Sequence, residues 1–244
     1  MQLTYGINPL IEGLLSQPPV FEKVLIARGR GGEDLRKILA LAERAGIPVE
    51  YVGREAIEKL APKSVHQGIL GMGRDHDYAT VEEVVANRHQ ENRHDLVIIL
   101  DGVADPRNLG SVIRTAHCLG ANGVVIPENR AASITAAAAK ASAGASELLP
   151  VAKVVNLVRT IAYLKETGFW IYGADAEAGD EISSLDYDGN VALVMGSEGR
   201  GIRPLIRRNC DFLISVPMRG RVTSLNVSVA TGVILFEILR KWGH

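Results

Sequence analysis

Cysteine, aromatic residues and an excess of either charge are all scarce in this chain. Its 244 residues include two cysteines, 5% aromatic residues and a formal net charge of −1. Cys118 and Cys210 lie in apolar stretches without CxxC or Cys/His spacing, which argues against a disulfide framework and a zinc site. Because the charges nearly balance, no overall field points to nucleic acid or to a membrane surface.

A hydrophobic run long enough to span a bilayer is also lacking. The long apolar stretch VSVATGVILFEIL is interrupted by Glu237 and is too short. The segment MQLTYGINPL has no basic region followed by an apolar one, so we expect no secretory signal and a cytoplasmic protein with reduced cysteines. With 47% hydrophobic and 23% charged residues, the composition is typical of a globular protein of one or two domains.

Positive charge is concentrated in one region, although the net charge of the chain is close to zero. Between Glu198 and Arg221 the sequence has six arginines against two acids, Glu198 and Asp211. A local basic patch can bind phosphates even when the whole chain is neutral. The alternative is a solvated helix face with a few charged loops. The arginines are Arg200, Arg203, Arg207, Arg208, Arg219 and Arg221.

The first 74 residues have the pattern of a small α/β domain. Asn8 followed by Pro9 is a good helix start, and this helix should run to about Ser16. The apolar spacing of GEDLRKILALAERAG predicts another helix, ended by Gly46. We also expect strands at 23–27, 49–52 and 68–72 and a short helix at 54–60.

The segment from Gly73 to Asp95 is polar, charged and poor in periodic apolar residues. Thr80 and Glu83 form a capping-box pattern, so we expect a short helix inside this segment. We interpret residues 75–94 as the linker between a domain of residues 1–74 and a domain of residues 95–244.

From Leu96 onward strands and helices alternate, which predicts an α/β domain with a mostly parallel sheet. The final helix, about Leu225–Trp242, is apolar nearly all round before Glu237, and this indicates deep burial. The alanine-rich stretch AASITAAAAKASAGAS favours a closely packed helix, with a loop against a ligand as the alternative. We expect helices at 109–119, 134–142 and 155–167 and strands at 96–101, 123–127, 169–174, 191–196 and 212–217.

Three of these strands end in loops of small and polar residues. The strands LVIILD, VALVMG and FLISVP are continuous apolar runs, as in parallel sheets that are buried on both faces. The loops that follow them are GVADPRNLG, SEGRGI and MRGRVTSLN. Because ligands bind beyond the carboxyl ends of parallel strands, we expect the three loops to form one composite site.

The first loop combines a helix start with an arginine. Asp105 and Pro106 predict a turn, Asn108 can cap the helix that follows, and Arg114 lies six residues further on. An arginine near a helix N-terminus suits a phosphate or a developing oxyanion. The alternative is that Asn108 is only a cap and Arg114 a surface residue.

The second and third loops add glycines, a carboxylate and amides. MGSEGRGI has three glycines within six residues but matches neither a Walker loop nor the G-x-G-x-x-G pattern of Rossmann enzymes. Glu198 would repel a phosphate and suits a cationic or hydroxyl-bearing ligand, with a tight glycine turn as the alternative. Ser224 is a natural cap for the last helix, and Asn226 on its first turn must find a polar partner.

Taken in this order, the three segments resemble the signature motifs of the SpoU/TrmH branch of the SPOUT RNA methyltransferases. The matching segments are Asn108-LGSVI-Arg114-TA, Gly196-SEGR-Gly201 and Ser224-LNVSVA. The N-terminal segments YGINPLIEGLL and VHQGILG resemble the substrate-binding domain of the bacterial rRNA-modifying subgroup. The resemblance therefore covers nearly the whole chain.

The resemblance implies a fold, a cofactor and partners. In this family a C-terminal α/β domain with a mostly parallel sheet contains a deep trefoil knot, and a small L30e-like α/β domain presents RNA. The family binds S-adenosylmethionine and works as a homodimer. This subgroup methylates a guanosine ribose in the peptidyl-transferase P loop of 23S rRNA. A tRNA ribose methyltransferase and a catalytically inactive RNA-binding assembly factor are the alternatives.

The resemblance also implies site residues. Catalysis and substrate handling map to Asn108, Arg114, Glu198, Ser224 and Asn226. Cofactor contacts, chiefly through main-chain groups, map to Gly196, Val216 and Leu225, with Met195, Pro217 and Met218 beside them.

The family's counterpart of Arg114 is proposed as the general base, but a guanidinium with a pKa above about 12 is a poor base. We favour a role in which Arg114 grips the adjacent phosphate and stabilises the developing alkoxide. No metal is expected, because a sulfonium leaving group needs no Lewis acid. We expect Arg28, Arg30 and the arginines of Arg200–Arg221 to bind RNA, and we interpret His66 as a turn residue bonded to the backbone.

Overall fold

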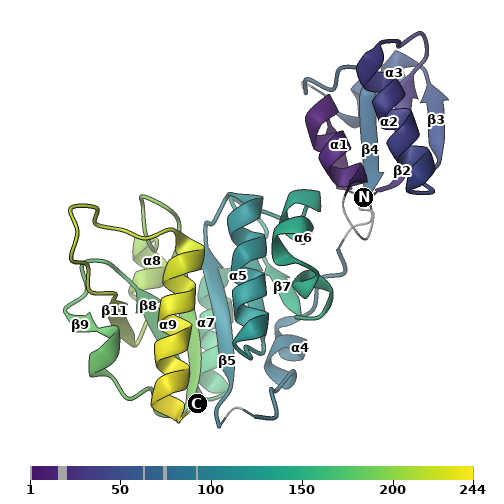
Figure 1. Cartoon of the computed structure of the whole chain (residues 1–244). Helices are drawn as coiled ribbons and strands as arrows, with labels where there is room; N and C mark the ends of the chain where they lie inside the picture. Colours follow the sequence, from purple (N-terminus) through teal and green to yellow (C-terminus); the bar gives the residue numbers. More distant parts are fainter. Residues whose placement is uncertain (1, 16–20, 63, 74–75, 92, 244) are drawn as a thin grey trace. The chain divides into compact units, whose positions relative to one another are not determined.

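The computed structural model describes residues 2–15, 21–62, 64–73, 76–91 and 93–243. Within them the chain forms two compact units (Figure 1). The first holds the described residues up to Asp77 together with Thr135–Lys140, and the second holds Tyr78–Ile134 and the described residues from Ala141 onward. Each unit has its own sheet and its own buried apolar residues.

The first unit is a four-stranded sheet with three helices. Its strand order is β1-β4-β2-β3, with β2 and β3 parallel and β4 antiparallel to both β1 and β2. The strands are β1 (Gln2–Tyr5), β2 (Phe21–Ala27), β3 (Val49–Val52) and β4 (Ile69–Gly73), and the helices are α1 (Ile7–Leu14), α2 (Glu33–Arg44) and α3 (Arg54–Leu60).

Side-chain alternation along β2 gives this sheet two buried faces. Val24 and Ile26 pack with residues of α1 and α2, whereas Leu25 and Ala27 pack with Ile57 of α3. The helices α1 and α2 therefore cover one face of the sheet, and α3 covers the other.

The predicted elements of this unit are confirmed apart from its N-terminal end. The helix α1 begins at Ile7 after Gly6, so Asn8 is not its cap, and the expected end near Ser16 lies outside the described residues. The strand β1 was not predicted because QLTY is too short to show alternation.

The second unit has a seven-stranded sheet in the order β7-β6-β5-β10-β8-β11-β9, with every neighbouring pair parallel. The mostly parallel sheet predicted from the sequence is therefore confirmed. The strands are β5 (Leu96–Asp101), β6 (Gly123–Pro127), β7 (Val151–Val154), β8 (Phe169–Ala174), β9 (Asp180–Glu181), β10 (Asn190–Gly196) and β11 (Phe212–Ser215).

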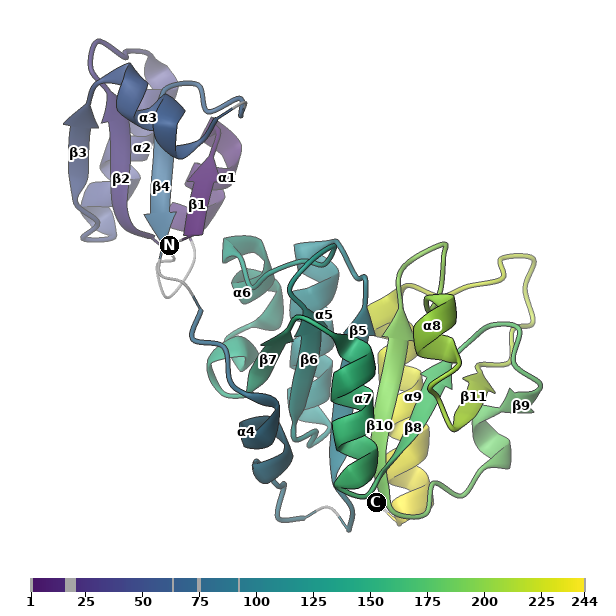
Figure 2. The ribbon, with the colours of Figure 1, turned by 180° about the vertical axis from the view of Figure 1, so that it is seen from behind.

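Helices cover both faces of this sheet (Figures 1 and 2). On one face, Val84 of α4 and Leu157, Ile161 and Leu164 of α7 pack against apolar strand residues. On the other face, α5 and α9 pack side by side (Figure 1). The helices of this unit are α4 (Val81–Ala86), α5 (Pro106–Cys118), α7 (Leu157–Glu166), α8 (Pro204–Arg207) and α9 (Val227–Trp242), with 3₁₀ turns at Ala145–Glu147 and Ile182–Ser184. Most of α6 (Ala136–Ser142) belongs to the first unit.

The short helix expected in the polar segment is present as α4. Both bonds of its capping box form, from the Glu83 amide to Thr80 Oγ1 (3.2 Å) and from the Thr80 amide to Glu83 Oε2 (2.7 Å). The Tyr78 hydroxyl accepts a hydrogen bond from the Ile134 amide at 3.0 Å. The part of this segment from Tyr78 onward thus packs as part of the second unit.

The predictions for the helix at 155–167 and for the last helix are wrong in detail. The helix expected from Val155 begins at Leu157, because the preceding VAKV forms β7 and Asn156 caps α7 through a bond from the Arg159 amide. The last helix is not deeply buried all round, since Phe236 is 63% exposed and Val229 is 51% exposed. The apolar residues of α9 therefore lie on two faces, of which one is buried against the rest of the unit and the other is exposed.

The described residues contain no helix that is long and apolar enough to cross a membrane. The trefoil knot that the resemblance implies stays a prediction, because strand order and pairing alone do not test it.

Candidate active site

Side chains from the three predicted loops meet in one closed hydrogen-bond ring. Asn108 donates through Nδ2 to Glu198 Oε1 at 2.7 Å. Asn226 donates through Nδ2 to the same Glu198 oxygen at 2.9 Å and to Asn108 Oδ1 at 3.0 Å. The composite site expected from the sequence therefore includes these three residues, which we call the Asn–Glu–Asn ring.

The start of α5 leaves the Asn108 side chain free for this ring. Asp105 caps the helix by accepting a hydrogen bond from the Arg107 amide at 2.8 Å, and Pro106 is the first helical residue. The prediction that Asn108 caps a helix beginning near Leu109 is wrong, because the helix begins three residues earlier. Asn108 lies inside the first turn, with both of its polar atoms bonded in the ring.

Asn226, not Ser224, caps α9. Its Oδ1 accepts hydrogen bonds from the Ser228 amide (3.0 Å) and the Ser228 hydroxyl (2.7 Å). The cap consumes the oxygen of the amide, so its nitrogen is the atom left for Asn108 and Glu198. One side chain therefore both begins the helix and closes the ring.

The glycine loop after β10 folds back on itself and carries Glu198. Ser197 and Gly201 exchange two backbone hydrogen bonds, of 3.1 and 2.9 Å. A Cβ at Gly196 would lie 2.1 Å from the carbonyl carbon of Gly201, so only glycine fits there. Gly199 and Gly201 have φ values of +79° and +64°, which L side chains rarely adopt. The glycines of this segment therefore let the chain approach itself closely at Gly196 and turn through positive φ at Gly199 and Gly201.

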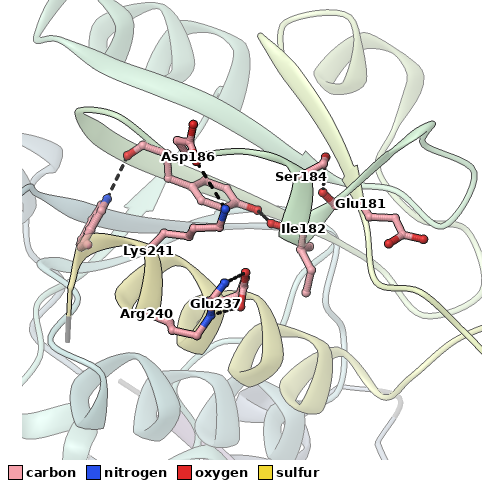
Figure 3. A network of polar contacts seen from close by, with 9 residues as sticks. Glu181, Ile182, Ser184, Asp186, Glu237, Arg240 and Lys241 are labelled. Atoms are coloured by element: carbon pink, nitrogen blue, oxygen red, sulfur yellow. Dashed lines mark hydrogen bonds and ion pairs between the residues drawn. The ribbon is translucent and has the colours of Figure 1, made fainter.

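The other end of α9 is tied down by polar contacts. Figure 3 shows Arg240 against Glu237, with bonds of 2.9 and 2.7 Å, and Lys241 beside Asp186 at 3.4 Å. The hydrogen bond from Arg240 holds the pKa of Glu237 below its ordinary value. These contacts, together with a bond from Trp242 Nε1 to the Tyr187 carbonyl (2.9 Å), fix the helix whose cap residue, Asn226, belongs to the ring.

The loop that precedes α9 offers unpaired main-chain groups. Among the described residues, those from Pro217 to Leu225 take part in no backbone–backbone hydrogen bond. Met218 and Leu225 present apolar side chains there, each 38% exposed. Val216 is half-buried directly after β11, whereas Met195 is buried inside β10. Unpaired amides and carbonyls beside apolar groups fit a flat, partly apolar ligand held through its polar edge.

Two of the five residues assigned to catalysis and substrate handling lie outside the ring. Arg114 is exposed on α5 and, among the described residues, has no hydrogen bond or ion pair. It lies six residues beyond Asn108, roughly 240° around the helix axis. Ser224 is exposed in the loop before α9 and also lacks a bond within the described part.

The basic patch predicted from the sequence is smaller than its six arginines suggest. Arg203 pairs with Asp101 at 2.6 Å, and Arg207 pairs with Asp175 at 2.5 Å. Burial alone would raise the pKa of Asp175, but hydrogen bonds from Arg207 and the Glu177 amide and the charge of Arg207 together lower it. Asp101 ends β5 and Asp175 directly follows β8. An acid at the carboxyl end of an apolar strand is the sequence signal that could have marked both as partners of a cation.

In the first unit, Arg28 is exposed and Arg30 is half-buried in the loop after β2. The His66 ring accepts a hydrogen bond from the Gly68 amide at 3.0 Å and is 7% exposed. The interpretation of His66 as a turn residue bonded to the backbone is confirmed. The described residues contain no cluster of three or more acidic, histidine or cysteine side chains that could hold a metal.

The two-unit fold agrees with comparisons to known families. The second unit matches the SpoU rRNA Methylase family over residues 95–236, and the first matches the family described as RNA 2′-O ribose methyltransferase substrate binding over residues 3–79. The two matches define an RNA 2′-O-methyltransferase with its own substrate-binding domain. The chain belongs to the SpoU rRNA methylase family.

Individual relatives match along nearly their whole length. The chain is 38% identical to the Escherichia coli 23S rRNA (guanosine-2′-O-)-methyltransferase RlmB, covering 98% of each chain. It is 40% identical to YacO of Bacillus subtilis, which is named as a TrmH family tRNA/rRNA methyltransferase, over 97% of this chain and 94% of the relative. A solved structure of an AdoMet-bound rRNA methyltransferase from Sinorhizobium meliloti, 23% identical, has the same fold with a TM-score of 0.60 over 98% of this chain and 86% of that one.

Proposed function

We propose that this protein transfers a methyl group from S-adenosylmethionine to the ribose 2′-hydroxyl of a guanosine in the peptidyl-transferase P loop of 23S rRNA. The Asn–Glu–Asn ring beside the unpaired loop 217–225 carries the proposal. Similarity over nearly the whole chain to a relative named as a 23S rRNA (guanosine-2′-O-)-methyltransferase supports a guanosine ribose of 23S rRNA as the substrate. We further propose that the protein acts in the cytoplasm.

The cofactor supplies a methyl group activated on a sulfonium. The main chain at Gly196, Val216 and Leu225 would hold it, with Met195, Pro217 and Met218 beside it. This assignment fits the loop's unpaired polar groups and the absence of room for a side chain at Gly196. No metal ligand is required for a leaving group that departs as a neutral thioether.

The residues of the chain prepare the hydroxyl for an in-line displacement. Glu198 and the two asparagines present a fixed set of donors and acceptors that can orient a ribose. Arg114, which is exposed and uncommitted, grips the phosphate next to the target and stabilises the negative charge that develops on the 2′-oxygen as the hydroxyl proton passes to solvent water. Ser224 orients the ribose from the loop before α9. A 2′-hydroxyl target also selects RNA over DNA.

RNA binding uses arginines in both units, all of them exposed apart from the half-buried Arg30. Arg28 and Arg30 lie in the loop after β2, and Arg200, Arg219 and Arg221 lie in the loops after β10 and β11. Arg203 and Arg207 are excluded from RNA binding because each already forms an ion pair with a carboxylate.

We also propose that the protein is a homodimer. The exposed row Val229, Val233 and Phe236 on α9 is an apolar surface that a second copy can cover by two-fold symmetry.

A tRNA ribose is the second candidate substrate, because the name of the B. subtilis relative includes tRNA as well as rRNA. The test is to incubate the protein with radiolabelled S-adenosylmethionine and, separately, unmodified 23S rRNA, 16S rRNA and bulk tRNA, and to map the label by nuclease digestion and mass spectrometry. We expect 2′-O-methylguanosine at one site of 23S rRNA. Label in tRNA alone would move the protein to the tRNA branch, and no label in any RNA would contradict the proposed reaction.

A further inference from the structure

Asp101 is a buried carboxylate whose two oxygens both bind Arg203. Its side chain is 0% exposed at the end of β5. Oδ2 accepts a hydrogen bond from the Arg203 backbone amide at 2.8 Å, and Oδ1 accepts one from Arg203 Nε at 2.6 Å, with Nη2 also at 2.6 Å. The carboxylate therefore binds both the main chain and the guanidinium of Arg203.

This pair joins the two loops that supply the Asn–Glu–Asn ring. Asp101 is the last residue before the loop that leads to Asn108, and Arg203 follows the glycine loop that carries Glu198. In the sheet, Asp101 lies opposite Gly196, the last residue of β10 before the glycine loop. The loop 197–202 is thus anchored at one end by strand pairing and at the other by Asp101.

A short loop held at both ends has few conformations, so Glu198 loses little further entropy when the ring forms. The anchor is also strong, because a buried carboxylate without its partner would be left with an uncompensated charge. The guanidinium of Arg203 remains 51% exposed, yet its donors already face a carboxylate. It contributes to the geometry of the site instead of to RNA binding.

We infer that Asp101 and Arg203 are a positioning pair for methyl transfer, which holds Glu198 at its place in the ring. The inference rests on the proposed function and adds two residues that touch neither the ribose nor the cofactor. A positioning role predicts that the pair raises kcat by holding the loop 197–202 in place. It also predicts that once one member is replaced, replacing the other has little further effect.

The test compares Asp101→Asn, Arg203→Gln, Arg203→Lys and the double variant Asp101→Asn/Arg203→Gln in full-length protein. We expect each of the first two changes to lower kcat about 10- to 100-fold while KM for the RNA changes less than about twofold. Arg203→Lys should recover part of kcat, because the backbone bond remains and an ammonium can donate to Oδ1. The double variant should be no slower than the slower single variant, because the two residues form one unit.

Arg207→Gln is the matched control. It breaks an arginine–carboxylate pair that lies one helical turn further on and ends at Asp175 beside β8. This pair does not anchor the glycine loop, so kcat should stay within about twofold of the wild type for a similar change in Tm. Equal losses in Arg207→Gln and Asp101→Asn would show a general stability effect and overturn the inference.

Hydrogen exchange gives a readout that needs no substrate. In Asp101→Asn the amides of Ser197 and Gly201, each bonded to the other's carbonyl, should exchange at least about tenfold faster than in the wild type, while in Arg207→Gln they should not change. Unchanged exchange and unchanged kcat in Asp101→Asn would refute the inference alone. Wild-type protein that labels no RNA but shows the expected exchange pattern would instead refute the proposed reaction and leave the anchor established.

Discussion

The side-chain nitrogen of Asn226 lies 3.0 Å from the side-chain oxygen of Asn108, although 118 residues separate them in the chain. The same nitrogen also reaches Glu198, so the amide of one helix cap links two loops at the carboxyl end of the sheet. Because the cap holds the oxygen of this amide, the helix fixes which way its nitrogen points.

Replacing Asn226 by Asp should separate folding from catalysis. Asp is as good a helix cap as Asn, so α9 should still begin at the same residue. The donor to Glu198 is lost, however, and two carboxylates then face each other. We expect kcat to fall about 100-fold with a Tm change of only a few degrees, measured by methyl transfer and thermal unfolding.

Asn156→Asp is the control for this change. Asn156 caps α7 in the same way, through the Arg159 amide, but takes no part in the ring. Its substitution should leave kcat unchanged. Full activity in Asn226→Asp would show that the ring is a structural feature without a role in the reaction.

Arg114→Ala should remove charge stabilisation without disturbing the fold. The side chain is exposed and bonded to nothing among the described residues, so its loss leaves no buried group unpaired. We expect kcat to fall about 100- to 1000-fold, with cofactor binding measured by calorimetry unchanged. Arg159→Ala, an exposed arginine on α7, is the control and should keep wild-type turnover. Near-full activity of Arg114→Ala would remove this residue from the mechanism.

Two glycines of the same loop should respond very differently to alanine. A Cβ at Gly196 would lie 2.1 Å from backbone, so Gly196→Ala should lower the free energy of unfolding by about 3 kcal/mol or more and abolish cofactor binding. Gly199 has open space around it and only an unfavourable φ of +79°, so its substitution should cost about 1 to 2 kcal/mol. Urea unfolding measures both, and equal costs would contradict the steric explanation.

The sequence was informative where local pattern and chemistry coincide. Continuous apolar runs predicted the parallel strands, and the polar loops after them predicted one site, because parallel strands end at the same edge. The capping box of Thr80 and Glu83 was readable for the same reason, since both bonds are made within four residues.

The remaining features depend on contacts that sequence spacing does not reveal. Asn108 and Ser224 were expected to cap helices, yet Asp105 and Asn226 do so, because several neighbouring residues are equally good caps. The Asp101–Arg203 pair joins residues 102 positions apart, so the local sequence at the end of β5 can mark Asp101 but not its partner. The exposed face of α9 was predicted to be buried because it carries apolar residues, as the buried face does.

The two cysteines should differ sharply toward alkylation. Cys118 is exposed, whereas burial raises the pKa of Cys210 to about 11 from an ordinary value of 9.0. Iodoacetamide at pH 8 should therefore modify Cys118 first, as mass spectrometry of the peptides can show. Because the folded pKa of Cys210 is raised, its contribution to stability is complete below pH 9.0 and is lost as the pH rises through about 11. Rapid modification of Cys210 in folded protein would contradict this burial.

Phe236→Asp should convert the proposed homodimer into monomers. The side chain is 63% exposed in the single chain, so a charge there costs little in the monomer but would be buried in a dimer. Light scattering after size exclusion measures the mass, and Phe236→Leu is the conservative control. A monomeric wild-type protein would contradict the proposed homodimer.

The Asn–Glu–Asn ring has a consequence for synthesis of the protein. Its bonds span 90 and 118 residues, and its last member begins the final helix of the chain. A chain that has been made only as far as β11 already has the strands of the sheet but lacks Asn226, so the ring cannot close. The ring therefore forms late in folding, only after α9 has been made and has packed on the sheet.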